Sequence, residues 1–271
     1  MIEAPQDETE DPVFVELLAE GAVALVTLNR PGERNPLDRR TISALYSQLV
    51  RLTTSNLIDA IIVTGAGPAF SAGGDLKGYT SLFDRPEEFL VFMEEFSALC
   101  DLLETCSQVT VAMVNGDCVA GGLEIALSCD FVTIAEDARI GDGHLRFGQL
   151  PGAGGSQRIV RAIGAQRAKH WLLSGDLFGA EEAVRAGLAI ETAPRDRLLE
   201  RTLSIVLNAT LHSSLARRKM KQLIRYAVDT HLSDGLQREI QLVLDYATTS
   251  QDAREGLAAF AERRNPRYLG R

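Results

Sequence analysis

Apolar residues follow two different patterns along the first two thirds of the chain. Four short runs are almost wholly apolar and are bounded by turn-forming residues, which is the pattern of strands covered on both faces. Between these runs, apolar residues recur every three or four positions, which predicts amphipathic helices. The predicted strands cover 22–30, 59–65, 109–116 and 130–135, and the predicted helices cover 38–53, 88–105 and 121–129. Strands that alternate with helices indicate an α/β or mixed layered domain.

From about residue 195 onward the pattern becomes entirely helical. Four segments have amphipathic spacing, and several begin with Ser or Asp, whose side chains cap helix N-termini. These segments cover 196–209, 213–228, 232–248 and 250–264. Because no long linker precedes them, we expect these helices to pack on the core or on a neighbouring subunit.

The net charge of −9 over 271 residues is concentrated at the N-terminus. Seven acidic and no basic residues lie in the first twenty, so the rest of the chain is near −2. We expect an acidic, solvated tail over 1–12 and a body without the basic face that nucleic acid favours. No apolar run reaches the roughly 20 residues that span a bilayer, and MIEAPQDETEDP lacks the order of a signal peptide. We therefore predict a cytoplasmic protein that binds neither nucleic acid nor membrane.

Several common motifs are missing, and their absence removes whole classes of chemistry. The glycine-rich stretches 65–75 and 152–158 contain G-x-G but do not continue to G-x-x-G, and no P-loop, G-x-S-x-G or H-E-x-x-H motif occurs. The four cysteines show no C-x-x-C spacing, so we expect buried thiols and neither disulfides nor a zinc site. These cysteines are Cys100, Cys106, Cys118 and Cys129.

Two glycine turns remain, each directly after a predicted buried strand. AFSAGGDL (69–76) follows the strand that ends at Thr64, and NGDCVAGGLEIALSCD (115–130) follows the strand that ends near Val114. In the second turn Gly121 begins a helix, whose first backbone N–H groups lack helical partners and carry the positive end of the dipole. Glycine lets an anionic oxygen approach such groups closely. Two turns of this kind converging on one carbonyl would form an oxyanion hole, in which each donor typically contributes about 3 kcal/mol.

These turns belong to a set of four motifs that closely resembles the crotonase (enoyl-CoA hydratase/isomerase) superfamily. The motifs are AFSAGGDL, VNGDCVAGGLEIALSCD, LPGAGGSQRIVRAIG and EGLAAFAERRNP, and the resemblance runs from about residue 13 to the C-terminus. It implies an α/β fold, with a crotonase-like spiral of ββα units over 13–195. It also implies a helical C-terminal region over 196–271 that forms homotrimers or dimers of trimers. The implied substrate is an acyl-CoA thioester, with coenzyme A as part of the substrate and with no prosthetic group or metal.

The resemblance also implies roles for individual residues. The thioester carbonyl would lie between the backbone N–H groups of Gly74 and Gly121, and Glu124 would be a catalytic acid–base group. The segment that borders the adenine of CoA corresponds to Ala72, Asp75, Leu76 and Lys77. Lys77 is explained equally well as a solvated loop residue. The segment 79–96 would set the size of the acyl group, although an aromatic stripe on a helix is more often core packing. Its aromatic residues are Tyr79, Phe83, Phe89, Phe92 and Phe96.

The second catalytic position departs from the hydratase pattern. Hydratases of this family have another glutamate twenty residues after the first, but this chain has His144 there. A nearby carboxylate would raise the pKa of His144 and burial would lower it, and either result lies near neutral pH. A histidine here also resembles the crotonase-fold β-diketone hydrolases, which have an aspartate where this chain has Ala153. The other interpretation is a loop histidine bonded to Asp142 or to backbone.

We therefore expect an acyl-CoA enzyme in which Gly74 and Gly121 stabilise a thioester enolate while Glu124 and His144 move protons. Hydration or dehydration of an enoyl-CoA is the first expectation, double-bond isomerisation the second and C–C bond hydrolysis the third. The change from glutamate to histidine also leaves open an acyl-CoA-binding protein that has lost its activity.

Overall fold

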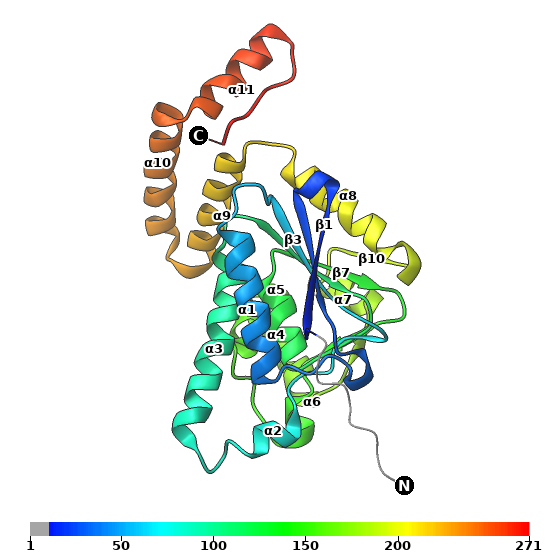
Figure 1. The fold of residues 1–271 in the computed structure, drawn as a ribbon. Helices are drawn as coiled ribbons and strands as arrows, with labels where there is room; N and C mark the ends of the chain where they lie inside the picture. The colour runs from blue at the N-terminus through cyan, green and yellow to red at the C-terminus, as the bar shows by residue number, and fades with distance from the viewer. Residues whose placement is uncertain (1–10, 271) are drawn as a thin grey trace.

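The computed structural model describes residues 11–270, so most of the predicted acidic tail lies outside the described residues. A six-stranded sheet forms the centre of the molecule, in the order β1-β2-β3-β5-β7-β10 (Figure 1). β1 is antiparallel to β2, and the other neighbouring strands are parallel. The strands are β1 (Val13–Leu18), β2 (Val23–Leu28), β3 (Ala60–Gly65), β5 (Val109–Val114), β7 (Phe131–Ala135) and β10 (Glu191–Ala193). The four predicted strands are thereby confirmed as the four central ones.

A second, smaller sheet is built from very short strands in the order β4-β6-β8-β9. These strands are β4 (Ala69–Ser71), β6 (Asp117–Val119), β8 (Arg139–Gly141) and β9 (Phe178–Gly179). β3, β5 and β7 of the large sheet each lead through a short turn into β4, β6 and β8 of the small one, and helices follow. This repetition is the predicted spiral of ββα units. It places the segments that follow β4, β6 and β8 close to one another, because these three strands pair side by side.

The helices of the core cover the sheets on several sides. α1 (Arg39–Thr53) packs against α3 (Pro86–Thr105) and against β1 and β2. The Asp38 side chain caps α1 by accepting a hydrogen bond from the Thr41 N–H at 2.8 Å. The remaining core helices are α2 (Leu76–Thr80), α4 (Gly121–Ser128), α5 (Gly155–Ile163), α6 (Ala165–Ser174) and α7 (Ala180–Ala186). All four cysteines are free thiols, as predicted, and only Cys129 is partly exposed.

The four predicted C-terminal helices are present but do not form one unit. α8 (Leu198–Thr210) packs on β5, β7 and β10, where its Thr202 hydroxyl lies 2.8 Å from that of Thr133. It therefore packs with the sheet, although the sequence pattern places it with the helices that follow. α9 (Ser214–Asp229), α10 (Leu232–Thr249) and α11 (Gln251–Glu262) form an arm that projects from the core (Figure 1).

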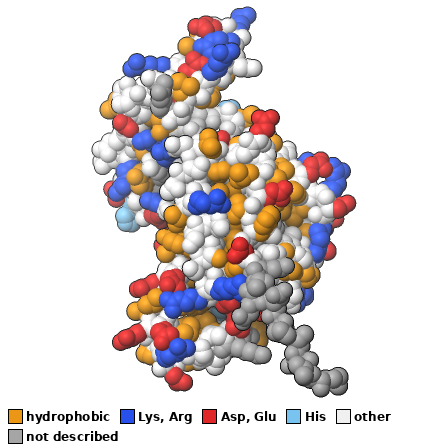
Figure 2. Space-filling model, viewed as in Figure 1, with side chains coloured by type: hydrophobic (Ala, Val, Ile, Leu, Met, Phe, Trp, Pro, Cys, Tyr) orange, Lys and Arg blue, Asp and Glu red, His pale blue; other side chains and the backbone are white. Residues whose placement is uncertain are grey.

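The arm of α9, α10 and α11 exposes many apolar side chains. Figure 2 shows hydrophobic side chains both on this arm and on the body below it. Those on the arm that are at least half exposed are Met220, Ile224, Val228, Leu232, Leu236, Ile240, Val243, Leu244, Leu257 and Phe260. No helix in the described part of the chain is long and apolar enough to cross a bilayer.

Candidate active site

The two glycine turns found in the sequence lie against each other. Gly73 has φ +94°, and a Cβ built on it would lie 2.9 Å from the Cβ of Ala120. Ala120 itself has φ +53°, which is unusual for a residue with a side chain. Its N–H donates a hydrogen bond to the Gly141 carbonyl at 3.1 Å, so β8 holds this turn in place. The turns after β4 and β6 thus pack together and form one wall of a small cavity.

Gly74 and Gly121 present backbone N–H groups at this wall. Within residues 11–270, neither N–H donates a hydrogen bond to another group of the protein. A Cβ on Gly121 would lie 2.9 Å from Leu37 Cδ1 and 3.1 Å from Phe96 Cε1, so only glycine fits there without displacement. Both glycines line a cavity of about 40 Å³. Its lining residues are Leu37, Gly74, Tyr79, Phe92, Met93, Phe96, Gly121, Glu124, His144, Gly152 and Ala153.

Glu124 enters this cavity from the first turn of α4. Its Oε1 accepts hydrogen bonds from the N–H groups of Ala153 at 2.7 Å and Gly155 at 2.9 Å. The side chain is almost fully buried, and burial raises the pKa of Glu124 above its ordinary value, although these two bonds and His144 act in the opposite direction. Because Oε1 is occupied, Oε2 is the oxygen left for proton transfer.

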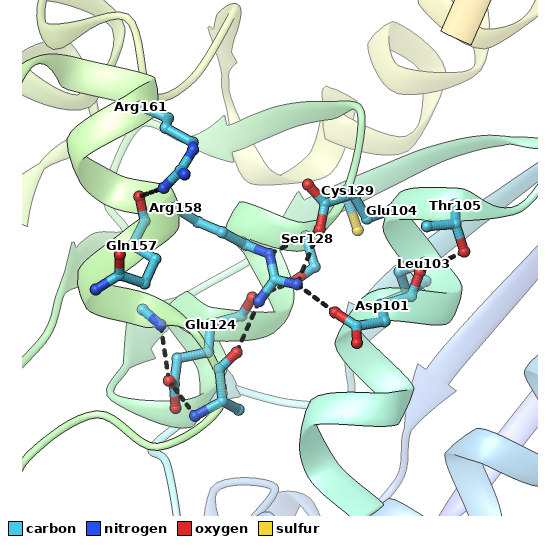
Figure 3. A network of polar contacts seen from close by, with 12 residues as sticks. Asp101, Leu103, Glu104, Thr105, Glu124, Ser128, Cys129, Gln157, Arg158 and Arg161 are labelled. Atoms are coloured by element: carbon cyan, nitrogen blue, oxygen red, sulfur yellow. Dashed lines mark hydrogen bonds and ion pairs between the residues drawn. The ribbon is translucent and has the colours of Figure 1, made fainter. Parts of the chain in front are cut away.

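Arg158 on α5 braces the loop that holds Glu124. Its Nη1 donates to the Ala153 carbonyl at 2.8 Å, and its Nη2 pairs with Asp101 and Glu104 of α3, both at 2.8 Å. Figure 3 shows the guanidinium between the Glu124 end of this network and α3. The position of the Glu124 side chain therefore depends on contacts between distant parts of the sequence, such as the pair of Arg158 and Asp101, which lie 57 positions apart.

His144 also lines the cavity, and it lies at the start of a short 3-10 turn that follows β8. Its Nδ1 lies 2.9 Å from Oδ1 of Asp142, whose side chain is 1% exposed. Burial tends to lower the pKa of His144, but the hydrogen bond and charge of Asp142, together with Glu124, outweigh it and raise this pKa. His144 is bonded to Asp142, as the alternative interpretation expected, and it also lines the same cavity as Glu124.

The residues expected to border adenine lie in the turn after β4 and at the start of α2. The Ala72 N–H donates to the Arg34 carbonyl at 2.9 Å, and Asp75 Oδ2 accepts from the Gly78 N–H at 3.0 Å. The side chains of Leu76 and Lys77 lie outside the described part of the structure. Asp75 lines a second cavity, of about 300 Å³. This cavity adjoins the first because both are lined by Leu37, Tyr79 and Phe92.

The aromatic segment divides between the cavity and its support. Tyr79, Phe92 and Phe96 line the small cavity, whereas Phe83 and Phe89 pack edge-on against Tyr79, with ring centroids 5.7 and 5.1 Å away. Sequence reasoning did not select Leu37, Met93 and Gly152, which also line the cavity, and it gave Asp142 no functional role. The spacing Asp-x-His in the sequence could have indicated that Asp142 contacts His144.

The fold and this cavity define an enzyme of the enoyl-CoA hydratase/isomerase family, and the chain belongs to that family. The sequence matches the family described as Enoyl-CoA hydratase/isomerase over residues 19–271. It is similar to the 2,3-dehydroadipyl-CoA hydratase of Escherichia coli K12, with 35% identity over 251 residues, covering 92% of this chain and 96% of that protein.

Solved structures agree with the assignment of the fold. The enoyl-CoA hydratase of Bacillus anthracis superposes with a TM-score of 0.89 at 31% identity, over 96% of this chain and all of that chain. DspI of Pseudomonas aeruginosa superposes with a TM-score of 0.87 at 30% identity, over 98% of this chain and all of that chain. The crotonase-like fold that the four motifs implied is therefore confirmed.

Proposed function

We propose that this enzyme adds water across the C2–C3 double bond of 2-enoyl-CoA thioesters, and catalyses the reverse dehydration. Gly74 and Gly121 would bind the thioester carbonyl oxygen, and Glu124 and His144 would move the protons. Names given to relatives, including the Escherichia coli 2,3-dehydroadipyl-CoA hydratase, support this reaction class. The acyl group of this enzyme's own substrate is a separate question.

Hydration requires a negative charge to develop on the thioester oxygen. When water attacks C3, the electrons of the double bond move toward the carbonyl and form an enolate. Two backbone N–H groups aimed at that oxygen stabilise this charge, and removing one donor from such a site typically costs about 10²- to 10³-fold in rate. The uncommitted N–H groups of Gly74 and Gly121 support this role.

The observation that carries the proposal is the arrangement of one small cavity. Two uncommitted N–H groups, a buried carboxylate and an imidazole all line it. Hydration needs one group to take a proton from water and another to give a proton to C2, and the cavity is lined by two groups that can do so, Glu124 and His144. A vestigial binding protein would not require two titratable groups to face one buried space.

The test is an assay of crotonyl-CoA and longer 2-enoyl-CoAs. We expect loss of the conjugated thioester absorbance and formation of a 3-hydroxyacyl-CoA, identified by mass. The Glu124→Gln variant keeps the size of the side chain and should lose about 10²- to 10⁴-fold in kcat. If the wild-type protein converts none of these substrates but shifts the double bond of a 3-enoyl-CoA, isomerisation replaces hydration.

We further propose that the arm of α9, α10 and α11 mediates assembly into trimers or dimers of trimers. Apolar side chains recur at helical spacing on α9 and α10 and are left exposed in the single chain, and a surface of this kind fits burial against another copy. Light scattering after size-exclusion chromatography should give a mass about three or six times the 29.5 kDa of one chain. A monomer at micromolar concentration would contradict this.

A further inference from the structure

The Asp142 carboxylate is committed to a single partner, His144. Oδ1 accepts from the imidazole Nδ1 at 2.9 Å, and Oδ2 accepts from the His144 backbone N–H at 3.3 Å. Gly143, between the two residues, has φ +66°, and a Cβ there would lie 2.9 Å from Val119 Cγ1. This turn brings the carboxylate back to the imidazole. In the described part of the chain no Lys or Arg pairs with Asp142.

This geometry fixes the state of the imidazole. An ionised carboxylate can only accept a hydrogen bond, so Nδ1 must carry the hydrogen that it receives. Nε2 is then the ring nitrogen available to the cavity that His144 shares with Glu124. A buried carboxylate that orients a histidine in this way determines its tautomer and stabilises the imidazolium form.

Of the other groups near His144, Glu124 acts in the same direction as Asp142. Glu124 of α4 lines the same cavity and adds a second negative charge, which also raises the pKa of His144. Tyr79 of α2 is uncharged, since burial and Glu124 raise the pKa of its phenol. Arg146, on the same turn, is paired with Asp176 at 2.8 Å. His144 therefore lies between two carboxylates, while Glu124 is held as a carboxylate by two backbone N–H groups.

We propose that Asp142 is a positioning residue that holds His144 with Nδ1 protonated, so that His144 Nε2 gives its proton to C2 while Glu124 takes a proton from water. This division of roles rests on the proposed hydration. As the water oxygen bonds to C3, its proton passes to Glu124 Oε2 and the double-bond electrons form the enolate. The enolate carbon then takes the Nε2 proton, which leaves a neutral imidazole and a protonated Glu124. Exchange with solvent returns the proton from Glu124 to His144 without any oxidant or reductant.

The Asp142→Asn variant tests the positioning role, because it removes the charge at nearly constant volume. We expect kcat for crotonyl-CoA to fall about 10²-fold or more with a smaller change in KM. The alkaline limb of the rate profile should move to lower pH, because the imidazolium loses its main stabilising charge. Asp176→Asn, which removes a carboxylate that pairs with the same turn outside the cavity, should change neither. An unchanged kcat and an unchanged alkaline limb in Asp142→Asn would overturn the proposal.

The assignment of the C2 proton to His144 is tested without hydration. Butyryl-CoA has an exchangeable C2 hydrogen but no double bond, so its exchange in D₂O reports only on that proton. We expect exchange to persist in Glu124→Gln and to be lost in His144→Gln, and the reverse pattern would overturn the assignment. The ¹⁵N shifts of the wild-type His144 imidazole should show Nδ1–H, and an Nε2–H tautomer would overturn the role of Asp142. The C2 exchange and the ¹⁵N shifts can both be measured even if the enzyme hydrates no enoyl-CoA. A failure of hydration would therefore refute the proposed function but not the roles of Asp142 and His144.

Discussion

The two acid–base candidates of the cavity, Glu124 and His144, are held in opposite ways. Glu124 is held by N–H groups that lie 29 and 31 positions later in the sequence, on a loop that Arg158 ties to α3. His144 is held by a carboxylate only two positions away. The first arrangement needs the whole fold, whereas the second needs only one short turn.

This difference has a chemical consequence. Neutral backbone donors stabilise the carboxylate of Glu124 without adding charge, while the Asp142 carboxylate stabilises a cation at His144. The cavity thus combines the carboxyl group of Glu124 and the imidazole of His144, called below its anionic and its cationic side, in place of two similar carboxylates. The predictions below test whether the two sides differ in this way.

The largest effect should come from His144→Glu, which removes the difference between the two sides. It places a third carboxylate beside Asp142 and Glu124, and like charges so close together disfavour ionisation of all three. We expect kcat for crotonyl-CoA to fall about 10³-fold. The double variant His144→Glu/Asp142→Asn relieves one charge and should recover at least about tenfold of that loss, measured as a double-mutant cycle. Hydration faster than in the wild type would show that the cationic side serves another reaction.

Much of the fold could be predicted from the sequence because burial leaves a pattern in it. β2, β3, β5 and β7 are nearly fully buried and read as continuous apolar runs. β1 was not predicted as a strand, because it is an edge strand with several exposed positions. The strands of the small sheet have three residues or fewer, too few for any period to be read.

The site shows the same division between local and distant contacts. The Asp142–His144 contact lies within three residues, and Asp142 was among the partners of His144 expected from the sequence. The donors to Glu124 and the Arg158 brace could not be predicted, because no local pattern shows which loop folds against α4. Family resemblance selected Glu124 itself, but not the groups that hold it.

Removing the brace should have the next largest effect. Arg158→Met keeps much of the side-chain volume but leaves the Ala153 carbonyl without its donor, so the loop that holds Glu124 loosens. We expect kcat to fall about 10- to 100-fold and the free energy of unfolding to fall by about 1–3 kcal/mol. Arg161→Met is the matched control, because Arg161 lies on the same helix and, among the described residues, its side chain donates a hydrogen bond only to the Gln157 carbonyl. Equal effects in both variants would show that the loss comes from α5 and not from the loop.

The pH profile should report both sides of the cavity in one measurement. Glu124 must be ionised to act as a base, so kcat/KM should fall as the pH drops through its pKa, which burial raises above 4.5. His144 must be protonated to act as an acid, so kcat/KM should also fall as the pH rises through its pKa, which Asp142 raises above 6.5. Each limb should approach a tenfold loss per pH unit. An alkaline limb centred below pH 6.5 would contradict a stabilised imidazolium.

The smallest effect should come from a change in the shape of the cavity that leaves its charges in place. A Cβ on Gly152 would clash with Met93 Sδ, so Gly152→Ala must displace Met93, and both residues line the cavity. Because methionine is flexible, we expect this displacement to raise KM for crotonyl-CoA about fivefold, equivalent to about 1 kcal/mol, with the pH limbs unchanged. Gly179→Ala is the control, since a Cβ there meets nothing within 4 Å. If Gly152→Ala shifted either limb of the pH profile, the packing around Met93 would also control the ionisation of Glu124 or His144. The shape of the cavity and the charges in it would then not be independent.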